Sequence, residues 1–245
     1  MKVIEKPIAI EEGDSFKTVL SKYGALALDK QENLSELIGE TVGDLDIEKG
    51  IISFDDISLP VQILGFYSQD LEQWSWAWDN EDIFGENLIK LSKQIKDIGD
   101  EFEINEFNSP DIHSDYNDCH SLAMTSTAIF DYDAYYAVSE DGIDIFVVIK
   151  SDLIKENNSV VKFRDTYLTF QKNFNIYPRI AFEAYTKLKG YGYKPHDDFA
   201  LAKIGESRVM VGFTERGNVT RILIFGDDER WNHESGFSWR NRIYD

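Results

Sequence analysis

Segments with strand character follow one another directly along this sequence instead of alternating with helical segments. Three such segments, rich in apolar and aromatic residues, precede residue 80, at residues 45–54, 59–67 and 74–78. Short connectors join them, and strands joined in this way pair as antiparallel neighbours. A doubly wound parallel sheet needs strands that alternate with helices. The pattern therefore predicts an α+β fold, with antiparallel sheets and helices packed on them.

A long amphipathic helix is predicted ahead of these strands. It begins after Asp14, its apolar residues recur every three or four positions, and Gly39 marks its end. Its polar residues 29–32 are expected to face solvent. Further elements are predicted as helices at 86–98 and 119–130, a loop or short strand within 100–118, and a hairpin of 134–138 with 143–149.

The pattern of elements starts again after residue 150. Val160–Phe170 is rich in β-branched and aromatic residues and predicts a strand, and a helix is predicted over Ile176–Lys189. Three more strand segments predict a meander, at 199–204, 209–214 and 219–225. Trp231 and Trp239 lie in a polar tail and predict that the tail packs on the body. The chain is therefore expected to contain two α+β parts of similar size.

The charge of the chain changes sign at the same place. Residues 1–149 carry 9 Lys and Arg against 32 Asp and Glu, a net charge of −23. Residues 150–245 carry 16 against 13, a net charge of +3. We therefore predict an acidic α+β domain at 1–152 and a C-terminal α+β part at 153–245, with few core contacts across residue 150.

Composition argues against several classes of protein. The single cysteine, Cys119, cannot form an internal disulfide, which suits a reducing compartment. No segment approaches the run of about 18 apolar residues typical of a membrane span, and residues 1–10 lack the apolar core of a secretory signal. We expect a cytoplasmic protein that binds no membrane. The acidic surface would repel phosphates, so direct binding of nucleic acid is not expected.

Three runs in the first part resemble a bacterial family of unknown function. They are a helix end at residues 28–39, a PVQxLGxYS-like strand at 60–68, and a WxWAWxN run at 74–80. The last is the most specific, because tryptophan at three alternate positions is rare. The resemblance covers roughly residues 16–152 and implies a bacterial cytoplasmic protein. It implies no activity, because the family has none assigned.

The three tryptophans are the main candidates for a site. Trp74, Trp76 and Trp78 are expected on one face of a strand, because side chains alternate with period two. They form either a core platform beneath the helices or an aromatic wall for a flat or apolar ligand. Candidate partners for buried indole N–H groups are Gln62, Ser75 and Asn80, although Asn80 could instead cap a turn. The candidate ligand-binding residues are therefore Trp74, Trp76, Trp78, Asn80 and Gln62.

Other polar groups do not assemble a catalytic or metal site in the sequence. Asp44, Asp46 and Glu48 alternate ahead of Gly50, but a calcium loop needs its glycine one position earlier. Cys119 stands beside His120, yet neighbours on a helix point apart, so a buried thiol is predicted. We therefore predict no catalytic residue, no metal site and no cofactor.

Two functions stay open at this point. The first is a non-catalytic binding protein whose acidic part engages a basic protein, as immunity proteins do with basic toxins. The second is a small-molecule-binding pocket protein, or a simple enzyme, with an aromatic-lined cavity. A sealed core beneath the tryptophans favours the first, and an open apolar pocket favours the second. The charge bias and the lack of a catalytic constellation make the first the leading hypothesis.

Overall fold

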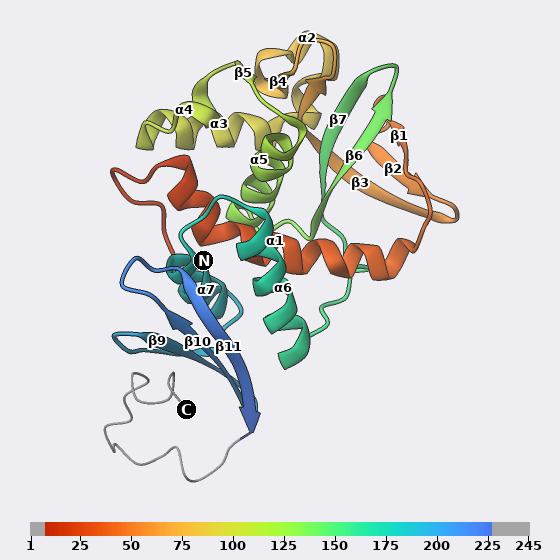
Figure 1. Cartoon of the computed structure of the whole chain (residues 1–245). Coiled ribbons are helices and arrows are strands. Elements are labelled where there is room, and N and C mark those ends of the chain that lie inside the picture. The colour runs from red at the N-terminus through yellow and green to blue at the C-terminus, as the bar shows by residue number, and fades with distance from the viewer. Residues whose placement is uncertain (1–7, 227–245) are drawn as a thin grey trace, which may run out of the picture.

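A computed structural model describes residues 8–226, which form two antiparallel sheets with helices between and around them (Figure 1). The seven-stranded sheet comprises β1 (Asp44–Asp46), β2 (Ile51–Phe54), β3 (Ile57–Ser68), β4 (Gln73–Trp76), β5 (Asp111–His113), β6 (Ala134–Glu140) and β7 (Ile143–Ile149). The four-stranded sheet comprises β8 (Gly192–Pro195), β9 (Phe199–Ile204), β10 (Ser207–Phe213) and β11 (Val219–Gly226). The predicted α+β fold with antiparallel sheets is confirmed. The predicted packing of Trp231 and Trp239 lies outside the described residues.

The helices fall into two groups along the chain. Those before residue 150 are α1 (Phe16–Ile38), α2 (Glu81–Phe84), α3 (Lys90–Phe102), α4 (Asn105–Asn108) and α5 (Tyr116–Ile129), with short 3₁₀ turns η1 (Ala77–Asp79) and η2 (Glu86–Leu88). Those after it are α6 (Val160–Asn173) and α7 (Pro178–Leu188). Within the described part of the chain, no helix combines the length and apolar character that crossing a bilayer requires.

The long strand β3 organises the larger sheet. The strands follow the order β1-β2-β3-β4-β5. This is the predicted series of antiparallel neighbours before residue 80, extended by β5. Along its second half β3 also pairs with β7, and β7 pairs with β6 in the predicted hairpin. Gly142 closes that hairpin with a φ of 81°, a left-handed conformation that glycine adopts without a steric penalty. The turns at the ends of β3 and β6 therefore meet at one end of the sheet.

Helix α1 lies across the middle of the molecule, between the larger sheet and the C-terminal helices (Figure 1). The Ser15 hydroxyl caps it by accepting from the Thr18 N–H, and Gly39 ends it as predicted. The helix packs against α5 on one side and against α6 and α7 on the other. One buried apolar cluster includes side chains from all of these helices and both sheets, among them Tyr23, Trp76, Leu122, Tyr167, Phe182 and Val211.

This shared core contradicts the expectation that few core contacts cross residue 150. Gly24 of α1 sits so close to Phe170 of α6 that an added Cβ would lie 2.5 Å from the ring. Phe163, Tyr167 and Phe182 of the C-terminal part belong to the same buried cluster as Tyr23 and Leu26 of α1. A domain boundary between residues 152 and 153 stays a prediction, and any such boundary is spanned by a large apolar contact.

Two charged side chains of α1 are buried against neighbouring elements, which corrects, for Asp29 and Lys30, the expectation that residues 29–32 point to solvent. Asp29 is 2% exposed and Lys30 is 7% exposed. The Asp29 carboxylate lies 3.1 Å from the Lys162 ammonium of α6 and 2.7 Å from that of Lys189. The Lys30 ammonium lies 2.6 Å from the Asp131 carboxylate. The polar stripe of α1 is therefore an ion-paired surface between elements, not a solvated face.

The segment Val160–Phe170, predicted as a strand, is the helix α6. The Ser159 hydroxyl caps it by accepting from the Lys162 N–H at 3.0 Å. Phe163, Tyr167 and Phe170 recur at steps of four and three, and this helical stripe is what packs on α1 and α7. β-Branched and aromatic composition indicated a strand, but tertiary burial of the stripe decides the conformation.

Two boundaries near α3 also differ from the predictions. The helix begins at Lys90, after η2, and continues through Gly99 to Phe102, beyond the expected end at residue 98. Gly99 is needed for close approach, because an added Cβ would lie 2.8 Å from the Cβ of Phe107 in α4. Residues 100–118 contain the end of α3, all of α4 and β5, and the start of α5, together with connecting loops.

Candidate binding site

Trp74 and Trp76 lie in the sealed core of the molecule. Both belong to β4 and are 0% exposed, and their rings meet edge to face with centroids 5.1 Å apart. Trp78 lies beyond the end of the strand in η1, so the expectation of three indoles on one strand face is wrong for this residue. The Lys96 ammonium instead lies over its half-buried ring, 4.7 Å from the ring centroid, in a cation–π contact.

The polar partners expected for the indoles act elsewhere. The Trp76 N–H donates to the carbonyl of Glu106 at 3.0 Å. The Asn80 amide donates to the Trp76 carbonyl at 2.9 Å, which is the turn-capping role, and Gln62 donates to the Asn87 carbonyl at 3.0 Å. A ligand-binding role for Trp74, Trp76, Trp78, Asn80 and Gln62 stays a prediction.

The surroundings of Cys119 and His120 do not favour nucleophilic chemistry. Burial raises the pKa of the Cys119 thiol to about 12, and the carboxylates of Asp118, Asp115 and Asp144 act in the same direction. The thiol donates to the Asp115 carbonyl at 3.3 Å. Burial lowers the pKa of His120, whose Nδ1 lies 3.0 Å from the Tyr135 hydroxyl. A protonated, buried thiol is a poor nucleophile.

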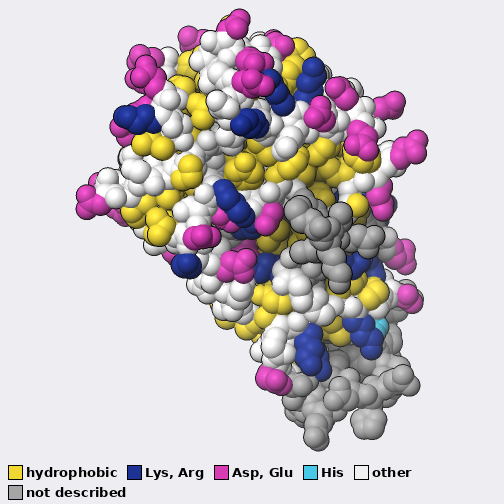
Figure 2. Space-filling model, turned by 180° about the vertical axis from the view of Figure 1, so that it is seen from behind, with side chains coloured by type: hydrophobic (Ala, Val, Ile, Leu, Met, Phe, Trp, Pro, Cys, Tyr) yellow, Lys and Arg dark blue, Asp and Glu magenta, His cyan; other side chains and the backbone are white. Residues whose placement is uncertain are grey.

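The segments that form most of the larger sheet contain no lysine or arginine. The chain has no lysine or arginine between residues 50 and 89 or between residues 97 and 149. These segments contain β3 to β7 and α5. The carboxylates of these segments outnumber the lysines that reach them from outside: Lys93 pairs with Glu81, and Lys30 and Lys150 pair with Asp131. On the face shown in Figure 2, acidic side chains are spread widely over the part of the molecule that contains this sheet.

Six of these carboxylates meet at one end of the sheet. Two belong to the β3–β4 turn, two to the β6–β7 hairpin end and two to the beginning of α5. A backbone hydrogen bond of 3.0 Å from the Gln69 N–H to the Gly142 carbonyl joins the two turns. We call this exposed group the acidic rim; it comprises Asp70, Glu72, Asp115, Asp118, Glu140 and Asp141.

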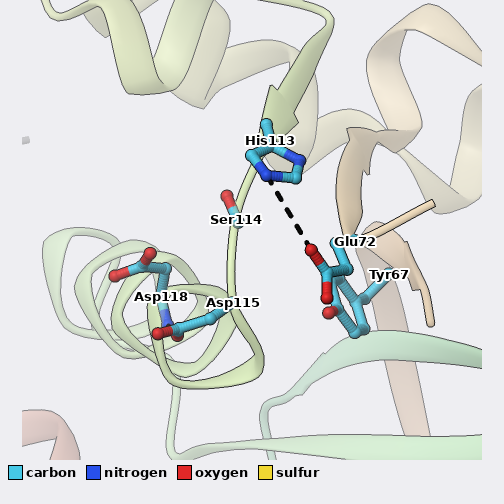
Figure 3. A pocket seen from close by; sticks show the side chains of 6 residues that line it. All are labelled: Tyr67, Glu72, His113, Ser114, Asp115 and Asp118. Carbon is cyan, nitrogen blue, oxygen red and sulfur yellow. Dashed lines mark hydrogen bonds and ion pairs between the residues drawn. The ribbon is translucent and has the colours of Figure 1, made fainter. Parts of the chain in front are cut away.

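A pocket opens within the acidic rim (Figure 3). Its cavity volume is about 260 Å³, and it is lined by Tyr67, Glu72, His113, Ser114, Asp115 and Asp118. Pairing of β4 with β5 brings its two halves together, because the Ser114 N–H donates to the Glu72 carbonyl at 3.0 Å. Asp115 caps α5 by accepting from the Asp118 N–H at 2.9 Å. In Figure 3, Asp115 and Asp118 stand across the pocket from Glu72 and Tyr67.

The pocket combines exposed charged groups with two largely buried residues that carry hydroxyl groups. Glu72 and His113 are largely exposed, with the His113 Nε2 3.9 Å from the Glu72 carboxylate. Tyr67 is 7% exposed and Ser114 is 6% exposed. Burial raises the pKa of Tyr67, and the neighbouring charges of Glu72, Asp115 and Asp144 reinforce this, so the phenol stays protonated. Carboxylates around hydroxyl groups form a site that can accept hydrogen bonds from a cation.

A metal ion does not fit this donor set. Across residues 8–226, no three His, Cys, Asp or Glu side chains converge as ligands of one ion. The carboxylates instead stand on opposite walls of the pocket (Figure 3).

Sequence reasoning did not identify this pocket. It gave Tyr67, Glu72, His113 and Asp115 no role in a binding site. About 40 residues separate the two halves, and only the register of β4 against β5 brings them together. The one available signal was the density of Asp and Glu in turns that lack lysine and arginine.

Comparison with known proteins identifies the first part of the chain only as a family. No curated protein and no solved structure matches this chain. A family model described as "family of unknown function (DUF6882)" matches residues 17–152. The match covers more than half of the chain, from α1 through the larger sheet, and includes every residue of the acidic rim. The chain therefore belongs to this family of unknown function, DUF6882.

Proposed function

We propose that this chain is a non-catalytic binding protein, bacterial and cytoplasmic, whose acidic N-terminal part engages a basic protein partner. Immunity proteins that neutralise basic toxins are the model for such a role. The observation that carries the proposal is the acidic rim, six exposed carboxylates on elements that contain no lysine or arginine. Complementary charge would speed association with a basic partner and favour it over other proteins.

Apolar groups next to the rim add to the case for a protein partner. Leu71, at the tip of the β3–β4 turn, is 65% exposed, and Tyr116, at the start of α5, is 41% exposed. The Tyr116 ring packs against Tyr67 in the pocket, with centroids 5.9 Å apart. Protein interfaces commonly surround such aromatic and apolar groups with polar residues.

The alternative, a small-molecule pocket with a tryptophan wall, receives less support. Trp74 and Trp76 are both fully buried in the common core, where they leave no wall for a ligand. The pocket of the acidic rim is polar and open rather than apolar and enclosed. The protonated thiol of Cys119 likewise gives no support to nucleophilic catalysis.

The proposal is tested by capture from an extract of the organism that encodes the chain. The immobilised wild-type protein should retain a basic protein at low salt and release it as salt increases. The comparison variant carries Asp70→Asn, Glu72→Gln, Asp118→Asn, Glu140→Gln and Asp141→Asn, which leaves the Asp115 cap intact. Loss of the captured protein on this variant supports the proposal. Capture of the same proteins by both forms, or of no basic protein, contradicts it.

A further inference from the structure

We propose that residues 227–245 of this chain dock on the outer face of its four-stranded sheet. The outer face is the surface formed by the side chains of β8 to β11 that point away from α6 and α7. This sheet lies at the end of the molecule away from the larger sheet (Figure 1). The inference goes beyond the proposed function, because it concerns a different surface and involves no second protein.

Helices α6 and α7 pack on one face of this sheet, which is its inner face. The contacts join α6 to β10 and α7 to β8. Val209 and Val211 of β10 point to the inner face, because both belong to the buried cluster that includes side chains of these helices. Side chains alternate along a strand, so Met210, which lies between them, points to the outer face.

An apolar row crosses the middle of the outer face. Leu201 of β9 and Leu223 of β11 pair directly with Met210 and therefore point to the same side. Among the described residues, none of the three belongs to or packs against either buried apolar cluster. Side chains on one sheet stand roughly perpendicular to it and leave their ends accessible. Met210 is nevertheless only 2% exposed, which indicates that this face has a cover.

Cations flank the apolar row. In the register of the sheet, Arg208 pairs with Lys203 on one side of the row, and Lys194 of β8 pairs with Leu201. The four strands contain no Asp or Glu. Such a surface favours an occupant that combines apolar side chains with acidic ones.

Residues 227–245 have this combination. Five acids and three arginines give the segment a net charge of −2, and three of the acids, at 227–229, follow directly after β11. Each of its two tryptophans can bury about 150–250 Å². Docking would therefore remove apolar area of both the segment and the row from water. The large apolar and aromatic residues of the segment are Trp231, Phe237, Trp239, Ile243 and Tyr244.

The segment also starts beside this surface. β11 is an edge strand, and its last residue, Gly226, pairs with Ser207 at the start of β10. Met210 lies three residues further along β10, about 11 Å from Gly226 by the usual spacings of residues and strands in a sheet. Trp231 follows Gly226 by five residues, which can span up to about 17 Å. The link is therefore long enough for Trp231 to reach the apolar row.

A second copy of the chain is the competing occupant of this face. A free copy loses overall translational and rotational freedom when it binds, whereas a tethered segment loses only its own chain freedom. A short link also gives the segment an effective concentration in roughly the millimolar range. These two effects favour residues 227–245 of the same chain.

The first test is NMR of the full chain with assigned methyl groups. Methyl groups of the apolar row should show NOEs to the indole ring of Trp231 or Trp239. Their signals should shift when both tryptophans are replaced together, as Trp231→Ala with Trp239→Ala. Val209 and Val211, on the inner face, are the internal control and should keep their shifts. Absent NOEs, or outer-face signals that are the same in wild type and variant, would overturn the proposal.

Mixed samples separate the same chain from a second copy. In an equimolar mixture of isotope-labelled and unlabelled chains, isotope-filtered spectra detect NOEs between copies. We expect no such NOEs between the apolar row and Trp231 or Trp239. Their presence would assign the docked segment to a second copy and overturn the proposal as stated.

Trypsin cleavage tests the docking surface itself. Leu223→Glu places a charge in the apolar row and should make cleavage after Arg230, Arg240 and Arg242 about fivefold to tenfold faster, because a docked segment is cut only after local opening. The control is Val42→Glu, at a residue that is 81% exposed elsewhere on the chain, and its cleavage should match wild type. Circular dichroism checks that both variants are folded. Equal rates in wild type and Leu223→Glu, or equal acceleration in both variants, would refute docking on this face.

Discussion

The Asp29 carboxylate lies 2.7 Å from the Lys189 ammonium, and both side chains are at least nine-tenths buried. Asp29 belongs to α1, whereas Lys189 directly follows α7, so the pair joins the family-matched part of the chain to its C-terminal part. Lys162 of α6 approaches the same carboxylate at 3.1 Å. One buried acid therefore ion-pairs with two buried lysines across this contact.

Asp29→Asn should lower the free energy of unfolding by about 3–5 kcal/mol, because removing one partner of a buried pair leaves uncompensated charge. Urea unfolding followed by circular dichroism measures the change. The control is Glu183→Gln, which removes the acid of a partly exposed pair with Lys187 and should cost less than about 0.5 kcal/mol. Equal unfolding midpoints for the two variants would show that Asp29 does not hold the helices together.

Trp76→Ala should lower the free energy of unfolding by about 3–5 kcal/mol, because a fully buried ring leaves a cavity and an unpaired Glu106 carbonyl. Trp78→Ala is the comparison, since its ring is only partly buried beneath Lys96, and its cost should be clearly smaller. Denaturant midpoints of the two variants decide the question. A Trp76→Ala midpoint equal to that of wild type would place this ring outside the core.

Stability should fall in alkaline solution in part because of Cys119. Burial raises the pKa of this thiol to about 12 in the folded protein, whereas an unfolded thiol titrates near ~8.5. Its stabilising contribution is complete below the unfolded pKa and is lost as pH rises toward the folded pKa. Between pH 9 and 10, wild type should lose about 1 kcal/mol more stability than Cys119→Ala. Identical pH profiles for both proteins would contradict the raised pKa.

Limited proteolysis tests how the two parts hold together. Residues 155–159 between β7 and α6 are exposed, and Lys155 offers a trypsin site. Cleavage there should leave fragments that elute together from a sizing column, because α1 packs on α6 and α7. Separation of a folded N-terminal fragment at neutral pH would favour independent domains instead.

Elements determined by local interactions could be predicted from the sequence, whereas elements determined by contacts with distant segments could not. The β6–β7 hairpin could be predicted because alternation and an Asp-Gly turn act locally. The helix α6 could not, because Val160 and Val161 favour a strand and the decisive burial of Phe163 and Tyr167 comes from elements outside the segment. The strand β8 was not predicted either, since it is short, mostly exposed, and contains Gly192 and Pro195, which are uncommon in strands.

The candidate site was less accessible to sequence reasoning than the fold. The tryptophan run is rare as a sequence pattern, yet Trp74 and Trp76 belong to the core. The pocket consists of common residues whose proximity depends on strand register, which is not encoded in local pattern. For the same reason the burial of Asp29 and Lys30 was not foreseen, because their partners are far away in the chain.

The most direct measurement for the proposed function is a calorimetric titration of the captured basic partner, once purified, into this chain at 50 and 250 mM salt. We predict a stoichiometric complex whose affinity falls steeply between these salt concentrations, and falls further when Glu72 and Asp118 are neutralised together. Affinity that changes with neither the salt concentration nor the neutralisation of Glu72 and Asp118 would contradict the proposal that the acidic rim binds the partner.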